Sequence, residues 1–272
     1  MSVAANFSIR GRVVAITGGS GVIGGTLARA RAAAGARVAL VDRNRPAADA
    51  TAAEIHAAGG EAMVSAGDVL DAAQMRAARD AIVASWGHVD ALVNAAGGNV
   101  ARARSDDRPV FDVPMDAFDE VLRLNLHGSV QPSLIFAEAM AARGSGSIVL
   151  ISSMAASQAL SGVLGYSVAK SGIDIFTRWM ATELAAKYGD GLRVNAIAPG
   201  FFVTHQNRDV LVMPDGSYTP RSRAIIAKTP MARFGKPEEL VGAVHWLCSD
   251  AATFVTGTVI PVDGGFSAFS GV

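Results

Sequence analysis

A glycine-rich turn between two apolar, β-type segments constrains the fold of this chain more than any other feature. Val13–Ile16 is a short run rich in β-branched residues, and it leads directly into Thr17-Gly-Gly-Ser-Gly-Val-Ile-Gly24. The Ala-rich segment that follows predicts a helix, which Gly35 ends. A second apolar run, Arg37–Val41, then reaches Asp42. Strand, glycine turn, helix, strand and acid in this order predict a βαβ unit.

A turn of this kind suits a dinucleotide, because glycines let the backbone approach a pyrophosphate and the helix N-terminus supplies N–H donors. Asp42 lies 24 residues after Gly18, close to the usual spacing for an acid that binds ribose hydroxyls. Its charge should repel a 2′-phosphate, so we expect NAD as the cofactor. NADP is the less favoured alternative, because Arg43 and Arg45 lie next to Asp42 and could bind that phosphate. The structural alternative for Asp42 is an ordinary exposed carboxylate at a strand end.

Strand-like and helix-like patterns alternate along the rest of the chain. Further strands are predicted at 61–65, 91–93, 147–151, 192–197 and 259–262, and further helices at 51–58, 72–85, 116–142, 166–188 and from Pro237. No linker, repeat or low-complexity segment interrupts residues 1–272. We therefore predict one α/β domain, a single doubly wound, Rossmann-like parallel sheet with helices on both faces. Pro132 should kink the helix at 116–142.

Two further segments are predicted to face a ligand. Asn94-Ala-Ala-Gly-Gly-Asn99 is a second turn of small residues after a predicted strand, which again suits close contact with a bound molecule. Residues 203–233 form a long irregular connection with three prolines, Pro214, Pro220 and Pro230. A connection of this length is usually functional, and we predict a lid over the substrate.

The composition excludes several kinds of partner. Lys and Arg total 24, as do Asp and Glu, and the pI near 7.0 argues against nucleic acid or an anionic membrane as a partner.

The single Cys248 permits no intrachain disulfide, and we predict that it is a core residue and that the protein lies in a reducing, cytoplasmic compartment. His205 has no partner at ligand spacing, so no metal is expected, and the N-terminus has no signal-peptide pattern. The mean hydropathy of +0.31 predicts apolar surface buried between subunits.

Tyr166 and Lys170 lie four residues apart with no proline or glycine between them, so they share one face of a predicted helix. A tyrosine with a pKa near 10 is a poor acid or base at neutral pH. A fixed ammonium nearby favours the phenolate and lowers that pKa, which enables the pair to move a proton. Taken alone, this spacing is more often structural than catalytic: an amphipathic helix with a half-buried tyrosine and a lysine that extends its charged end to the solvent.

Together these features resemble the short-chain dehydrogenase/reductase family, and the resemblance covers essentially the whole chain. The matching motifs, in order, are Thr17–Gly24, Asp68, Asn94–Gly97, Asn125, Ser153, Tyr166-x-x-x-Lys170, and Pro199-Gly200 with Thr204. The family usually has glycine where Val22 stands, and Gly21 just before it can compensate. The resemblance implies an NAD(P)-dependent oxidoreductase acting on a CH–OH group, and a homotetramer formed through the helices at 116–142 and 166–188.

The resemblance also implies residue roles. Tyr166 is the general acid in reduction and the base in oxidation, and Lys170 holds the nicotinamide ribose and lowers the tyrosine pKa. Ser153, with Ser152 as the alternative one residue away, hydrogen-bonds the substrate oxygen, and Asn125 anchors a water in a proton relay. The implied cofactor contacts are Gly18, Ser20, Gly21, Val22, Ile23, Asp42, Asp68, Val69, Asn94, Ala95, Gly97, Tyr166, Lys170, Pro199, Gly200, Phe202 and Thr204.

A narrower resemblance, carried by Asn94–Asn99, Ala198–Arg208, Thr229–Gly235 and Val262–Val272, is to the D-mannonate oxidoreductase (fructuronate reductase) branch. It implies interconversion of D-fructuronate and D-mannonate. A sugar acid needs a cation or amide for its carboxylate and donors for its hydroxyls. The predicted substrate residues are Asn99, Ser153, Tyr166, His205, Gln206, Asn207 and Arg208, with ordinary polar lid residues as the alternative. A ketone or 3-oxoacyl-type reductase and a non-catalytic dinucleotide sensor are the alternative functions.

Overall fold

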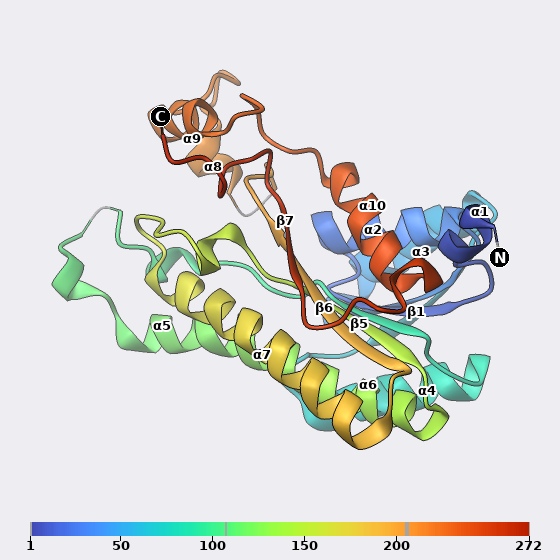
Figure 1. Ribbon diagram of the computed structural model, residues 1–272. Helices are drawn as coiled ribbons and strands as arrows, with labels where there is room; N and C mark the ends of the chain where they lie inside the picture. The colour runs from blue at the N-terminus through green and yellow to red at the C-terminus, as the bar shows by residue number, and fades with distance from the viewer. Residues whose placement is uncertain (1, 107, 205–206, 272) are drawn as a thin grey trace.

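Seven parallel strands form one continuous sheet at the centre of the molecule (Figure 1). The computed structural model describes residues 2–106, 108–204 and 207–271. The strands are β1 (Val13–Thr17), β2 (Arg37–Asp42), β3 (Glu61–Ala66), β4 (Ala91–Asn94), β5 (Gly146–Ile151), β6 (Leu192–Pro199) and β7 (Val259–Val262). The inner strands β1, β5 and β6 are buried along almost their whole length, because helices cover both faces of the sheet.

The strand order is β3-β2-β1-β4-β5-β6-β7, so the chain reverses direction across the sheet between β1 and β4. In sheets of this kind ligands bind outside the carboxyl ends of the strands at such a reversal. The glycine-rich turn after β1 and the small-residue turn after β4 lie side by side there, since Thr17 pairs with Asn94. The predicted fold class is therefore confirmed.

Helices cover both faces of the sheet. The described helices are α1 (Val3–Phe7), α2 (Val22–Ala33), α3 (Arg45–Ala57), α4 (Ala72–Trp86), α5 (Met115–Leu122), α6 (Gly128–Arg143), α7 (Leu164–Tyr188), α8 (Arg208–Leu211), α9 (Pro220–Lys228) and α10 (Val241–Cys248). One core contains α4, α6 and α7, with Phe136 at its centre. The opposite core contains α2, α3 and α10, with Leu27 among its buried residues. Among the described residues no helix is long and apolar enough to cross a membrane.

The long helix predicted at 116–142 is interrupted by a π-helical turn, Arg123–His127, between α5 and α6. Asn125 sits in this turn, fully buried, and its amide bonds the carbonyl of Val121 and the backbone of Gly98. The irregular turn therefore falls at Asn125, where a polar side chain competes for backbone groups. Pro132 lies inside α6.

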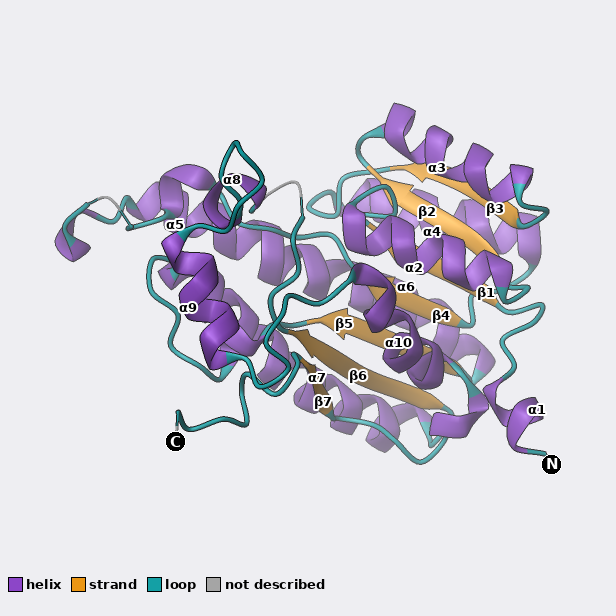
Figure 2. Cartoon of the chain, turned by 90° about the horizontal axis from the view of Figure 1, so that it is seen from above, coloured by secondary structure: helices purple, strands orange, loops and turns teal. Residues whose placement is uncertain are grey.

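The stretch 203–233 is more ordered than predicted, because it contains α8 and α9. Thr219 begins α9 by accepting a hydrogen bond from the N–H of Ser222, and Pro220 occupies the first turn, where its missing N–H costs nothing. Figure 2 shows α8 and α9 on the side toward which the strand arrows point, whereas the N-terminus lies at the opposite side. These helices are therefore placed at the ligand-binding end of the sheet.

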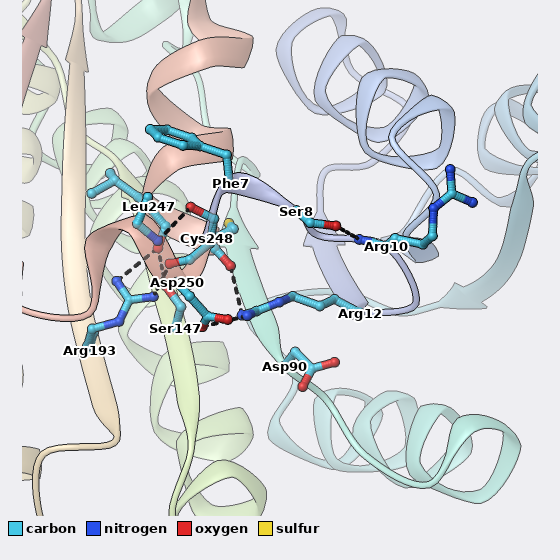
Figure 3. A network of polar contacts seen from close by, with 12 residues as sticks. Phe7, Ser8, Arg10, Arg12, Asp90, Ser147, Arg193, Leu247, Cys248 and Asp250 are labelled. Atoms are coloured by element: carbon cyan, nitrogen blue, oxygen red, sulfur yellow. Dashed lines mark hydrogen bonds and ion pairs between the residues drawn. The ribbon is translucent and has the colours of Figure 1, made fainter. Parts of the chain in front are cut away.

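The amino ends of β5 and β6 are fixed to the end of α10 (Figure 3). Arg193 donates to the carbonyls of Leu247 and Ser249 at 2.9 and 3.2 Å, and Arg12 donates to Cys248 O at 3.2 Å. Guanidinium groups at a helix C-terminus satisfy its last carbonyls and complement its dipole. Cys248 is fully buried, as predicted, and burial raises the pKa of its thiol.

Candidate active site

The glycine-rich turn packs against the turn after β4. Gly18 has a φ of +63°, and a Cβ there would lie 2.8 Å from Ala96 Cα. A Cβ on Gly24 would lie 2.1 Å from Gly18 O, so α2 approaches the turn as closely as a glycine allows. Gly21 begins α2 without a side-chain cap, and Val22 is its first residue. The exposed helix N-terminus and the close backbone approach fit a pyrophosphate.

Asp42 ends β2 and faces the turn. Its Oδ2 accepts hydrogen bonds from the N–H and hydroxyl of Ser20 at 3.0 and 2.7 Å, and its Oδ1 accepts from Asn44 N at 2.9 Å. Arg45 pairs with Asp49 at 3.4 Å along α3. Asp42 thus holds a fixed negative charge beside the turn, which fits ribose hydroxyls and opposes a phosphate.

The other predicted cofactor residues on this side follow β3 and β4. Asp68 accepts from Leu70 N at 2.9 Å, and Val69 is buried against the start of α6 at Gly128. Asn94 donates to the Ser133 hydroxyl at 2.9 Å, whereas its Oδ1 is buried without a hydrogen-bond partner among the described residues. An unpaired buried acceptor is a position where a bound molecule can supply the missing donor.

One cavity of about 250 Å³ brings many of the remaining predicted residues together. Its lining includes Ile23, Ala95, Gly97, Asn99, Ser153, Tyr166, Lys170, Pro199, Gly200, Phe202, Thr204 and Asn207. Ligand pockets for drug-sized molecules usually hold about 300–1,000 Å³. The cavity is therefore suited to a small substrate. Gly18, Ser20, Gly21, Val22, Asp42, Asp68, Val69 and Asn94 lie outside this lining.

Ser153 and Tyr166 interact at the cavity wall. A hydrogen bond with Ser153 lowers the pKa of Tyr166, but burial has the larger effect and raises that pKa above its usual value. Ser152, the alternative, instead donates its hydroxyl to Asp174 Oδ1. The geometry favours Ser153 as the serine that faces a substrate oxygen.

Lys170 is buried on α7 beside Tyr166. Its Nζ lies 5.4 Å from the centroid of the Tyr166 ring and donates to Ile151 O at 2.7 Å. Burial lowers the pKa of Lys170 to about 8, and the charge of Asp174 opposes this change. The pKa of Tyr166 is therefore raised, opposite to the lowering expected from Lys170, because burial dominates.

Asp174, which was not predicted from the sequence, lies one helical turn after Lys170. Burial raises the pKa of its carboxyl group, while the Ser152 hydrogen bond and the charges of Arg178 and Lys170 oppose that rise. The carboxylate therefore joins the end of β5 to the lysine-bearing face of α7. The spacing of four residues after Lys170 was the signal available in the sequence.

Asn125 contacts the cavity through its glycine-rich wall. Its Oδ1 accepts from Gly98 N at 3.0 Å, and its Nδ2 donates to Gly98 O at 2.7 Å and Val121 O at 2.9 Å. A Cβ on Gly97 would lie 2.8 Å from that Oδ1 and 3.7 Å from Lys170 Nζ. The side chain thus positions the Gly97–Gly98 backbone beside Lys170.

The predicted substrate residues are only partly brought together. Asn207 lines the cavity, but its amide bonds the loop itself, accepting from Thr204 N at 2.7 Å and donating to Phe202 O at 2.8 Å. Arg208 is exposed on α8 and does not line the cavity. His205 and Gln206 lie outside the described residues.

Two arginines that the sequence did not single out, Arg104 and Arg221, line the cavity in place of Arg208. The lining also includes the apolar residues Met154, Leu160, Val163, Phe201 and Leu211. Within the described ranges, no group of His, Cys, Asp and Glu is arranged to hold a metal ion. The site therefore combines a tyrosine, a lysine and a serine with two cations and several apolar side chains.

Known proteins resemble this chain over nearly its full length. A family model described as enoyl-(acyl carrier protein) reductase matches residues 19–267. An uncharacterised oxidoreductase of Bacillus subtilis is 43% identical, covering 97% of this chain and 98% of the relative, and D-threitol dehydrogenase of Mycolicibacterium smegmatis is 35% identical, covering 98% and 97%. A crystal structure from Haemophilus influenzae, provisionally assigned as a D-mannonate oxidoreductase with bound NAD, is 40% identical, covers 100% of both chains and has a TM-score of 0.92. The chain therefore belongs to the short-chain dehydrogenase/reductase family of NAD(P)-dependent oxidoreductases.

Proposed function

We propose that this protein transfers hydride between NAD(H) and a small keto or hydroxy acid of the sugar-acid type, with D-fructuronate and D-mannonate as the candidate pair. The observation that supports this proposal most is that Ser153, Tyr166 and Lys170 line one small cavity together with Arg104 and Arg221. The fixed carboxylate of Asp42 beside the glycine turn supports NAD over NADP. The similarity to the NAD-containing Haemophilus structure supports both parts of the proposal.

When bound, the dinucleotide supplies a hydride to the carbonyl carbon or accepts one from the alcohol. We assign the proton to Tyr166, whose hydroxyl gives it to the carbonyl oxygen in reduction and takes it back in oxidation. The Ser153 hydroxyl donates a hydrogen bond to the same oxygen and stabilises its developing charge. Lys170, with a pKa of about 8, exchanges its own proton close to neutral pH and is the proposed source for Tyr166. Asn125 positions the neighbouring glycine backbone.

The segment 203–233 is proposed as the substrate lid of a single domain. Thr204, Asn207, Val210, Leu211 and Arg221 from this segment all line the cavity. Since α8 and α9 are held to each other, the two short helices can cover the substrate as one piece. Closure of such a segment excludes water from the reacting groups.

A ketone reductase of the same family is the second candidate, because several apolar side chains line the cavity. The test is an assay of D-mannonate, other hexonates, neutral polyols and simple secondary alcohols, with NAD and NADP side by side. The proposal expects the highest kcat/KM with a hydroxy acid and NAD. A preference for an uncharged alcohol would favour the ketone reductase, and dinucleotide binding without turnover of any substrate would favour a sensor.

We further propose a cytoplasmic homotetramer. The outer faces of α6 and α7 expose large apolar side chains, with Leu134 at 50%, Ile175 at 61% and Trp179 at 53% of their full areas. These residues line one continuous groove between the two helices, next to α4. Contiguous apolar surface of this kind usually marks a contact between proteins.

A further inference from the structure

Arg104 and Arg221 reach the cavity from segments that are far apart in the chain. Arg104 directly follows the short 3₁₀ turn Ala101–Ala103, and Arg221 is the second residue of α9. Both line the cavity that contains Tyr166 and Ser153, and their side chains are 28% and 32% exposed. They are thus half-buried cations beside the proposed reacting groups.

Asp106 joins the two arginines. Its Oδ2 lies 2.6 Å from Nη2 of Arg104 and 2.8 Å from its Nε, and its Oδ1 lies 3.2 Å from Nη1 of Arg221. Arg221 also donates to the carbonyl and hydroxyl of Ser161 at 3.1 and 3.3 Å. The cluster therefore connects the loop after β4, the loop before α7 and the proposed lid.

The backbone leaves room for this arrangement. Gly162 has a φ of +79°, and a Cβ there would lie 2.4 Å from Asp106 Oδ1. Ser105 N donates to Gly162 O at 3.2 Å, which fixes the two loops to each other. A side chain at position 162 would displace the Asp106 carboxylate, which contacts both arginines.

The charges of the cluster do not cancel. Two guanidinium groups and one carboxylate leave one net positive charge at the cavity wall. Each guanidinium has five N–H donors in a planar fork, and Asp106 and Ser161 accept from only part of these donors. A carboxylate presents two coplanar oxygens that match such a fork.

We propose that Arg104 and Arg221, held in place by Asp106, form the subsite that binds the carboxylate of the substrate. The cluster selects a hydroxy or keto acid over the neutral polyol of the same shape. The inference rests on the proposed function, because it specifies which part of the chain recognises the acid. It also replaces Arg208, which the structure leaves outside the cavity.

The test compares D-mannonate with D-mannitol, in which a CH₂OH group replaces the carboxylate. Arg104→Gln and Arg221→Gln should each raise KM for D-mannonate by about tenfold or more, the usual effect of losing a charge-assisted hydrogen bond. kcat and the kcat/KM for D-mannitol should change by less than about threefold, because neither arginine touches the reacting atoms. Arg221→Lys keeps the charge without the fork and should recover part of the affinity.

Arg223→Gln is the matched control, since Arg223 is exposed on the same helix and donates to Tyr218 O. It should leave both substrates unaffected. The inference is overturned, with the proposed function intact, if the wild type prefers D-mannonate and the variants at 104 and 221 keep that preference. Both fail together if the wild type uses D-mannitol or another neutral alcohol at least as well as every hexonate tested.

Discussion

Replacing Gly24 by alanine tests the packing of the glycine-rich turn. A Cβ at this position would lie 2.1 Å from Gly18 O and 2.9 Å from its carbonyl carbon. Because non-bonded heavy atoms prefer about 3.5 Å, α2 must move away from the turn by about 1 Å. Overpacking of this kind costs about 1–3 kcal/mol, and the better helix propensity of alanine returns about 1 kcal/mol.

We therefore expect Gly24→Ala to lower the free energy of unfolding by up to about 2 kcal/mol, which corresponds to a fall in Tm of up to about 8 °C. NAD affinity should fall as well, because the helix N-terminus moves relative to the turn. Thermal unfolding followed by circular dichroism and calorimetric titration with NAD measure the two effects.

Gly25→Ala is the matched control, one residue along the same helix. A Cβ there would lie 3.4 Å from Arg29 Nη1 and 3.5 Å from Gly19 O, which is ordinary contact. This variant should be as stable as the wild type or more stable, by up to about 1 kcal/mol. The reasoning is refuted if the two alanine variants have the same Tm and the same NAD affinity.

Three further predictions concern the cofactor, the buried lysine and the assembly. Asp42→Asn removes the charge beside the glycine turn and should raise kcat/KM for NADP relative to NAD by about tenfold, whereas an unchanged ratio in the two assays would contradict the assignment. Burial lowers the pKa of Lys170 from its usual 10.5 to about 8, so the folded protein binds fewer protons than the unfolded chain between these values. The free energy of unfolding should therefore rise with pH across this window by up to about 3 kcal/mol in the wild type relative to Lys170→Met, as measured by urea unfolding. A difference between the two proteins that does not change with pH would contradict the burial of the lysine. Trp179→Glu should dissociate the proposed tetramer while Val3→Glu does not, and sedimentation that gives an unchanged mass for both would argue against the α6–α7 face as an interface.

The fold was readily predictable because its signals are local. The apolar runs predicted the number and order of the strands, and the positive φ of Gly18 suits a glycine wherever it lies in the fold. The π-helical turn at Asn125 was not predictable, since it depends on hydrogen bonds to Gly98 from another part of the chain. Propensity alone reads that segment as one regular helix.

The candidate site shows the same division between local and long-range information. Ser153, Tyr166 and Lys170 occur in one short stretch, and the structure brings them to one cavity. Arg104 and Arg221 are 117 residues apart in the sequence, and Asp106 contacts both of them. Nothing in the sequence distinguishes these two arginines from Arg208, which lies in the same segment as Arg221 but is exposed.

The pKa of Tyr166 shows how much the immediate surroundings matter. Spacing along the helix predicted a lowered pKa, but spacing does not report desolvation or the hydrogen bond from Lys170 to Ile151. A raised pKa suits the proposed role of Tyr166 as an acid that holds its proton until a substrate oxygen develops charge. In the proposed oxidation, Tyr166 would depend on Ser153 and Lys170 to act as a base.

The central claim is that Tyr166 moves the proton in hydride transfer to and from a small hydroxy acid. The most direct measurement is NADH formation from D-mannonate by wild type and Tyr166→Phe, with NAD affinity measured on both proteins. We predict that kcat falls by about 10²–10⁴-fold while NAD affinity stays within about twofold, because only the hydroxyl is removed. Unchanged turnover in the phenylalanine variant, with NAD still bound, would contradict the claim.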